Sequence, residues 1–187
     1  ACKVLDAQWL GVPQSRQRTI FVGVRNDLGV LPAHPQPLPY RYSVRDALPW
    51  ILKIAVTSTR YKDASTVQAS TGRRTSSTFQ NEPLGMVEAE TDISRFAIGA
   101  EYDKLKVGEA SKRFFSLVRV DPDVPHPTVC QCHGDSNVAS PTHPFERRKL
   151  SIAELKRICA FPDDFVLTGS YAQQWERLGR AVPPVMM

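Results

Sequence analysis

The last forty or so residues of this 187-residue chain carry its strongest structural signal, a pair of short amphipathic helices. Ser151 is followed three residues later by Glu154, the pattern of a capping box that opens a helix. The apolar side chains of this first helix recur at helical spacing and are Ile152, Leu155, Ile158 and Cys159. Ser170 opens the second helix, whose apolar stripe is Tyr171, Trp175 and Leu178. Two such stripes predict a folded core near this end of the chain.

Glycine and proline indicate where these helices end. Pro162, inside the stretch from Phe161 to Phe165, ends the first helix. Gly179 fits the residue that stops the second helix, and Pro183-Pro184 would open a third.

The N-terminal part favours strands and extended chain. An apolar-rich stretch over 3–10 predicts a strand, and Gly11-Val12-Pro13 ends it. Residues 19–24 form a nearly continuous β-branched and aromatic run, which predicts a strand buried on both faces. Four prolines within 32–39 predict an extended linker.

The middle of the chain contains few signals for regular structure. A capping box at 43–46 opens a short helix through Leu48. Residues 56–78 contain eleven Ser or Thr, which predicts a polar loop. The apolar stretch 114–118 predicts a strand, and residues 121–144 are predicted to be mostly loop.

The charge pattern favours a polyanionic partner. The net charge is +5, and Arg outnumbers Lys by 16 to 8. Arg binds phosphates and guanine edges bidentately, so this bias favours nucleic acid. Residues 51–81 carry five basic side chains and one acidic, whereas 82–92 carry four acidic and no basic ones. Two solvated loops explain the same pattern equally well.

Composition also excludes some classes of protein. No apolar run approaches the roughly 18 residues of a membrane helix. Four irregularly spaced cysteines are too few for a disulfide scaffold, which favours a reduced, cytoplasmic location. The first residue, Ala1, and the last, Met187, lead us to expect a fragment.

One basic cluster precedes the strand predicted over 19–24. In Gln14-Ser15-Arg16-Gln17-Arg18, alternation along an extended chain projects Arg16 and Arg18 to the same side. With the amide of Gln14 beside them, they could bind a phosphate or a base carbonyl. A solvated basic turn is the alternative from chemistry alone.

Three segments in a fixed order resemble the DNA (cytosine-5) methyltransferases of bacterial type. Gly11-Val-Pro-Gln-x-Arg-x-Arg18 is similar to the eighth conserved motif of that family. Residues 148–165, with Phe161-Pro-Asp-Asp-Phe165, resemble the ninth, and Gly179-x-Ala-Val-Pro-Pro184 the tenth. Pro127-Thr128-Val129 resembles a signature of the family's target-recognition domain.

The resemblance implies an α/β fold that appears as α+β in this piece. It would contain edge strands and C-terminal helices of a Rossmann-like methyltransferase sheet, together with a small, mostly β target-recognition domain. Residues 1–30 would end the catalytic domain, 31–146 would form the recognition domain, and 147–187 would return to the catalytic domain. We expect the apolar surfaces of 1–25 and 166–187 to be exposed in the isolated chain.

The resemblance also assigns roles to residues. Arg18 would contact a cytosine flipped out of duplex DNA, and Arg16 and Gln14 would support the active site and contact the DNA backbone. Thr128 would lie close to the DNA. Arg180, Ala181 and Val182 would complete the pocket for S-adenosyl-L-methionine, although the family usually has Asn where this chain has Arg180. From charge, Arg73 and Arg74 are expected to contact the DNA backbone.

Other parts of the family's catalytic machinery do not occur in this sequence. The Pro-Cys-Gln nucleophile loop and the Phe-x-Gly-x-Gly cofactor loop are missing. Cys130-Gln131 follows Val129 instead of a proline, so we do not accept Cys130 as the nucleophile. Cys132 and His133 lack a second ligand pair, so we expect no metal site.

The leading hypothesis is therefore the DNA-recognition portion of a DNA (cytosine-5-)-methyltransferase, bacterial or phage-encoded and inactive alone. Its partners would be duplex DNA and a missing N-terminal catalytic half, with no membrane. The alternatives are a separate DNA-specificity subunit of a split methyltransferase and a degenerate, non-catalytic remnant.

Overall fold

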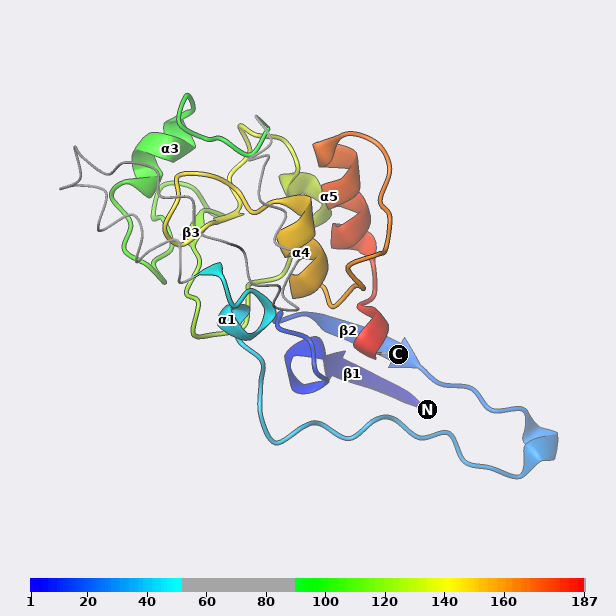
Figure 1. Ribbon diagram of the computed structural model, residues 1–187. Coiled ribbons are helices and arrows are strands. Elements are labelled where there is room, and N and C mark those ends of the chain that lie inside the picture. The colour runs from blue at the N-terminus through cyan, green and yellow to red at the C-terminus, as the bar shows by residue number, and fades with distance from the viewer. Residues whose placement is uncertain (52–89, 187) are drawn as a thin grey trace, which may run out of the picture.

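In the computed structural model, the described residues are 1–51 and 90–186. They form a helical body, from which an N-terminal hairpin and a long connection extend (Figure 1). The elements are β1 (Cys2–Asp6), η1 (Ala7–Trp9), β2 (Gln17–Phe21), η2 (Asn26–Leu28), α1 (Val44–Ala47), α3 (Ala97–Tyr102), β3 (Val118–Arg119), η3 (Gln131–His133), β4 (Pro141–Thr142), α4 (Ile152–Ile158), α5 (Tyr171–Arg180) and η4 (Pro184–Met186). The elements labelled η are single 3₁₀ turns.

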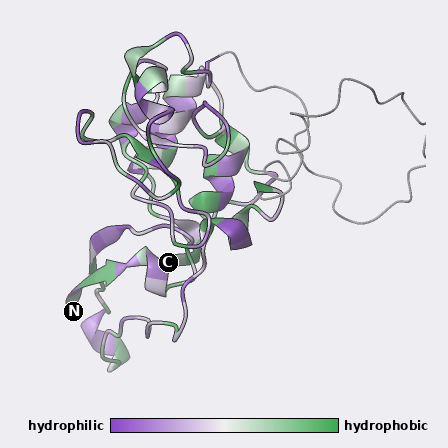
Figure 2. Ribbon diagram, turned by 90° about the vertical axis from the view of Figure 1, so that its left-hand side faces the viewer, coloured by the Kyte–Doolittle hydropathy of each residue, from purple (hydrophilic) through white to green (hydrophobic). Residues whose placement is uncertain are grey.

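Strands β1 and β2 pair antiparallel, with Cys2 opposite Phe21 and Leu5 opposite Arg18. Because successive residues of a strand face opposite sides, Leu5 and Arg18 share the inner face and Val4 and Phe21 the outer face. The inner face packs against Met186 of η4. The outer face is open, since Phe21 is 77% exposed and Val4 60%. These exposed apolar side chains belong to an arm that stands apart from the body (Figure 2).

The prediction of a strand buried on both faces is wrong. Strand β2 covers Gln17–Phe21 and ends before Gly23, and only its inner face is covered. A β-branched and aromatic run indicates a strand, but burial of the second face needs another layer, and no described element supplies one. The exposed outer face agrees with the expectation for residues 1–25.

The main core lies between α1, α4 and α5. The predicted capping boxes at Ser43 and Ser151 and the predicted helix cap at Ser170 are confirmed, since each serine side chain accepts a hydrogen bond from the N–H three residues on. The predicted stripes of α4 and α5 are buried, and Val44 of α1 and Leu48, which follows α1, belong to the same cluster. Because this core joins elements from both sides of residue 147, α1 and α4 pack as parts of one body.

Gly179 is not a helix stop. Helix α5 continues through Arg180, and Gly179 lies inside it. A Cβ at Gly179 would lie 2.5 Å from the backbone nitrogen of Gln131. The glycine is therefore needed because η3 packs directly on α5. Pro184 opens only the single turn η4.

Helix α3 and the strands β3 and β4 surround a smaller core, whose members are Ile93, Ile98, Tyr102, Leu105 and Leu117. The strand predicted over 114–118 is wrong, because Phe114–Leu117 form a turn and β3 begins at Val118. In the described part of 31–146, strands β3 and β4 have two residues each. A mostly β domain is thus not observed there, since prolines and short polar turns interrupt the chain.

The described chain is a mixed α+β fold with two small two-stranded sheets. No described helix is long and apolar enough to cross a membrane.

Candidate functional site

Arg16 joins three distant segments of the chain. Its side chain is 1% exposed. Nη1 donates to the carbonyl of Val129 at 3.0 Å, and Nη2 donates to the carbonyl of Gly179 in α5 at 2.6 Å. Burial, with a smaller contribution from the nearby Arg18, lowers the pKa of Arg16. The guanidinium thus holds β2, the loop after Thr128 and α5 together, and is not open to solvent.

The segments 13–15 and 126–128 run side by side next to Arg16. Ser15 N–H donates to the carbonyl of His126, and His126 N–H donates to the carbonyl of Pro13, each at 2.9 Å. The hydroxyl of Thr128 donates to the carbonyl of Ser15 at 2.5 Å. Thr128 therefore has a structural contact to the basic cluster, in addition to any role toward DNA.

Gln14 is fully buried beside the end of α4. Its Nε2 donates to Sγ of Cys159 at 3.2 Å, and its Oε1 has no partner among the described residues. Burial raises the pKa of the Cys159 thiol to about 11, so this sulfur stays protonated at neutral pH. The buried Gln14 is thus placed to support the packing around Arg16.

Unlike the buried Arg16, Arg18 is available to bind another group. It lies on the inner face of β2 opposite Leu5 and is half-buried. Its Nη1 donates to the carbonyl of Gln17 at 2.7 Å, and no described acidic side chain pairs with it. Arg18 therefore keeps donors for a further acceptor, and it lies close enough to Arg16 to lower the pKa of that residue.

The residues expected at the cofactor pocket follow α5. Arg180 pairs with Glu176 at 2.7 Å, and its Nε donates to Oε1 of Gln131 at 2.8 Å. Ala181 caps the helix in an extended conformation, and the Val182 side chain is 38% exposed. The guanidinium of Arg180 thus binds partners within the protein, whereas Ala181 and Val182 present an apolar surface.

The segment 148–165 contains a buried ion pair. Arg148 makes two hydrogen bonds to the carboxylate of Glu154, at 2.8 and 2.9 Å, and Glu154 also accepts from the N–H of Ser151. Burial opposes the charge of Glu154, but Arg148 outweighs it, so the pKa of Glu154 is lowered. This pair fixes the start of α4.

No sequence pattern indicated that several polar residues would be buried. Burial lowers the pKa of His126 and of His143 to about 4, so both rings are neutral at neutral pH. Lys149 is fully buried, donates to the carbonyls of His133 and Asp135 at 2.6 Å, and has its pKa lowered by burial to about 8. These contacts are between residues distant in sequence, which a local pattern cannot reveal.

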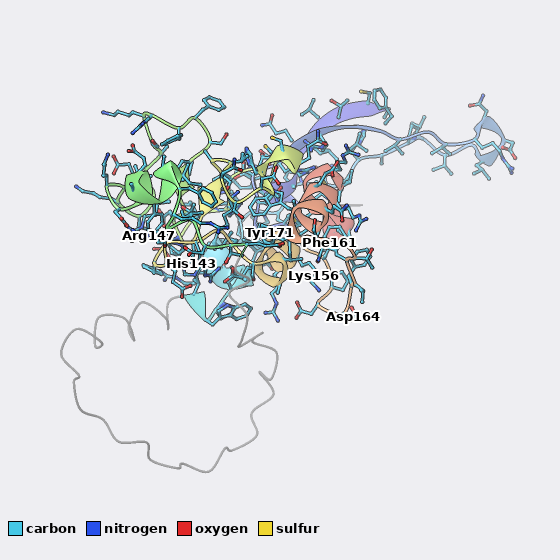
Figure 3. All side chains as sticks on the ribbon, turned by 90° about the horizontal axis from the view of Figure 1, so that it is seen from above. His143, Arg147, Lys156, Phe161, Asp164 and Tyr171 are labelled. Carbon is cyan, nitrogen blue, oxygen red and sulfur yellow. The ribbon has the colours of Figure 1, made fainter. Side chains whose placement is uncertain are left out.

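Figure 3 shows the two sides of the body, with His143 and Arg147 toward α3 and, on the other side, Lys156 of α4 with Phe161 and Asp164, which follow that helix. On the α4 side, an open pocket of about 550 Å³ lies between Gly11, Tyr42, Arg157 and Phe161. Arg157 pairs with Asp163 and lies over the ring of Trp50.

Arg73 and Arg74 lie outside the described residues. Cys130 is half-buried, with its thiol directed to the carbonyl of Thr128, and Cys132 is exposed.

Comparison with known proteins gives consistent results. All of residues 1–187 match the family model of C-5 cytosine-specific DNA methylases. The chain is 30% identical to the type II methyltransferase M1.HphI of Haemophilus parahaemolyticus, over 99% of this chain and 45% of the relative. It is 26% identical to M.DdeI of Desulfomicrobium norvegicum, over 98% of this chain and 51% of the relative. The chain thus spans about half the length of the curated relatives it matches.

Among solved structures, a prophage-encoded E. coli protein described as a candidate DNA modification methyltransferase superposes with a TM-score of 0.63. The match covers 99% of this chain and 56% of that one at 20% sequence identity. It shows that the two chains are similar in fold.

Proposed function

The chain belongs to the C-5 cytosine-specific DNA methylase family, and from that premise we propose that it is the DNA-recognition portion of a DNA (cytosine-5) methyltransferase. The complete enzyme would transfer a methyl group from S-adenosyl-L-methionine to C5 of a cytosine in duplex DNA. Homologues named as type II methyltransferases support a role in DNA methylation and restriction-modification.

The junction at Arg16 carries this proposal. It brings together the start of β2, the Thr128 loop and the end of α5, which are the segments that resemble functional motifs of the family. These contacts span 113 and 163 residues of sequence, so they are a property of the fold and not of local sequence. Arg16 and Gln14 would act as positioning residues, because both are buried.

Arg18 is the residue that we assign to the base. A cytosine flipped out of the duplex exposes its carbonyl oxygen, which accepts hydrogen bonds from a guanidinium. The half-buried position of Arg18 leaves donors for this purpose while Leu5 and the hairpin register fix its place. The loop at Thr128 would approach the same DNA.

S-adenosyl-L-methionine would supply the methyl group, and this chain would form part of its pocket. The exposed apolar surface of Ala181 and Val182 suits contact with an uncharged part of the cofactor. Arg180 would complete the same pocket, with its guanidinium held in position by Glu176 and Gln131. These contacts would also fix the end of α5.

Within this proposal, 1–30 and 147–187 belong to the catalytic side and 31–146 to recognition. The packing of α1 on α4 would hold the two parts in a fixed relation, because both contribute to one buried cluster.

The test is methyl transfer from radiolabelled S-adenosyl-L-methionine to duplex DNA. We expect no transfer by the chain alone, and transfer when it is mixed with the part of M1.HphI that precedes the matched region. The Arg18→Ala variant should lose this transfer while still binding DNA. Transfer by the chain alone would contradict the proposal, and DNA binding without transfer in any mixture would favour a non-catalytic remnant.

A further inference from the structure

Residues 108–119 form a finger that ends in a basic and aromatic tip. Gly108 N–H donates to the carbonyl of Arg119 at 2.8 Å, Arg119 N–H donates to the carbonyl of Glu109 at 3.0 Å, and Ala110 bridges to Val118 in antiparallel fashion. The two arms thus pair as a short hairpin, and the tip between them reads Lys-Arg-Phe-Phe-Ser over 112–116.

The tip is held in one conformation by Ser111 and Leu117 at its base. Ser111 N–H donates to the carbonyl of Leu117 at 2.8 Å, and the hydroxyl of Ser111 accepts from the N–H groups of Arg113 and Phe114. The same hydroxyl donates to Glu101 at 3.0 Å, which ties the tip to α3. Leu117 is fully buried in the smaller core.

Phe115 projects from this rigid tip with its side chain fully exposed, at 101% relative accessibility. A single exposed apolar residue is ordinary on a protein surface. Here, however, Lys112 and Arg113 precede Phe115 in the same tip, and both are exposed and form no ion pair with a described residue. Arg113 lies 5.2 Å over the ring of Phe114, which presents its guanidinium beside the tip.

We propose that the finger 108–119 inserts its tip into duplex DNA, with Lys112 and Arg113 on phosphates and Phe115 packed against bases. A two-stranded ribbon fits the major groove, and the two unpaired cations match the charge of the backbone. In that groove an exposed aromatic ring can pack against base edges and the methyl group of thymine. This inference rests on the proposed function and adds a contact surface to it that none of the motif-like segments contains.

The test measures binding of the full 187-residue chain to a pool of 40-base-pair duplexes at several salt concentrations. The Lys112→Gln/Arg113→Gln variant should reduce the slope of log affinity against log salt by about two. The Phe115→Ala variant should weaken binding by about tenfold with the slope unchanged, because it removes the burial of an apolar ring. The Phe115→Trp variant should show fluorescence quenching on DNA addition beyond that of the parent chain.

The matched control is the Arg25→Gln/Leu31→Ala variant, which removes one exposed cation and one exposed apolar side chain on the long connection near η2. It should bind DNA as the parent does, and circular dichroism should show the same helix content for all variants. If the finger variants bind as the parent does while the parent retains its salt slope, the finger is not a DNA contact, and the proposed function stands. If the parent shows no salt-dependent binding, both proposals fail.

Discussion

At the scale of single residues, the sequence predicted which side chains cluster but not how they are used. Alternation placed Arg16 and Arg18 on one side of an extended chain, and Arg18 lies close enough to contribute to the lowered pKa of the buried Arg16. The burial of Arg16 could not be predicted, because its partners Val129 and Gly179 are more than a hundred residues away. A local pattern specifies on which side of the chain a side chain lies, whereas its burial depends on which distant segments pack against it.

The Arg148–Glu154 pair leads to a prediction about stability. Glu154→Gln should lower the free energy of unfolding by about 3 kcal/mol, because it leaves the buried Arg148 charge without its main partner. Glu146→Gln is the control, since Glu146 also contacts Arg148 but is more exposed, and it should cost less than about 1 kcal/mol. Urea unfolding at pH 7 measures both. Equal effects of the two variants would rule out a special role for the buried partner.

The buried histidines predict a loss of stability in mild acid. The pKa of His126 is about 4 in the folded state, below the usual value of about 6.5, so the unfolded state binds a proton first as the pH falls. Stability from this residue is therefore complete above about pH 6.5 and declines toward pH 4, by about 2 kcal/mol at pH 5. His143 should behave in the same way.

The His126→Asn variant tests this assignment. Urea unfolding at pH 7 and pH 5 should show a smaller difference between the two pH values than in the parent chain. An unchanged difference would show that His126 does not carry the effect.

At the scale of elements, helices were predicted better than strands. Ser43, Ser151 and Ser170 begin helices because the capping contacts lie within three residues. The stretch 114–118 has strand-forming residues, yet the hydrogen bonds of Ser111 turn the chain there. Gly179 is an ordinary stop signal in isolation, and only the docking of η3 explains its place inside α5.

Gly179→Ala should therefore disturb the contact between η3 and α5. The added Cβ would lie within 3 Å of the backbone of Cys130 and Gln131, which cannot move as a flexible side chain can. We expect a loss of about 1–3 kcal/mol in the free energy of unfolding. Gly23→Ala, where no atom lies within 4 Å, should change stability by less than about 0.5 kcal/mol. Thermal unfolding of both variants compares them, and equal midpoints would contradict close packing at Gly179.

At the scale of the whole molecule, the α+β class and the family were predictable from three ordered motifs, whereas the distribution of the core was not. The predicted division at residue 147 follows sequence similarity, and it stays a prediction. The buried cluster shared by α1, α4 and α5 shows that packing runs across this position. Motif order therefore indicates ancestry, and long-range packing decides which segments form one body.

The open outer face of the hairpin predicts association of the chain. Val4 and Phe21 lie on one side of β1 and β2, so together they form an apolar surface without a cover among the described residues. Sedimentation should show concentration-dependent association of the parent chain. The Val4→Thr/Phe21→Thr variant should sediment as a monomer with an unchanged unfolding temperature. A monomeric parent chain would show that this face does not cause association.

The buried guanidinium of Arg16 also sets an order of events during synthesis. Its two acceptors are supplied by Val129 and Gly179, so the cation has no acceptor from these segments until more than a hundred further residues have been synthesised. The hairpin of β1 and β2 can pair early, because its strands are close in sequence, but it cannot dock until α5 has emerged. The hairpin is therefore synthesised before the segments that hold it and finds its place after them.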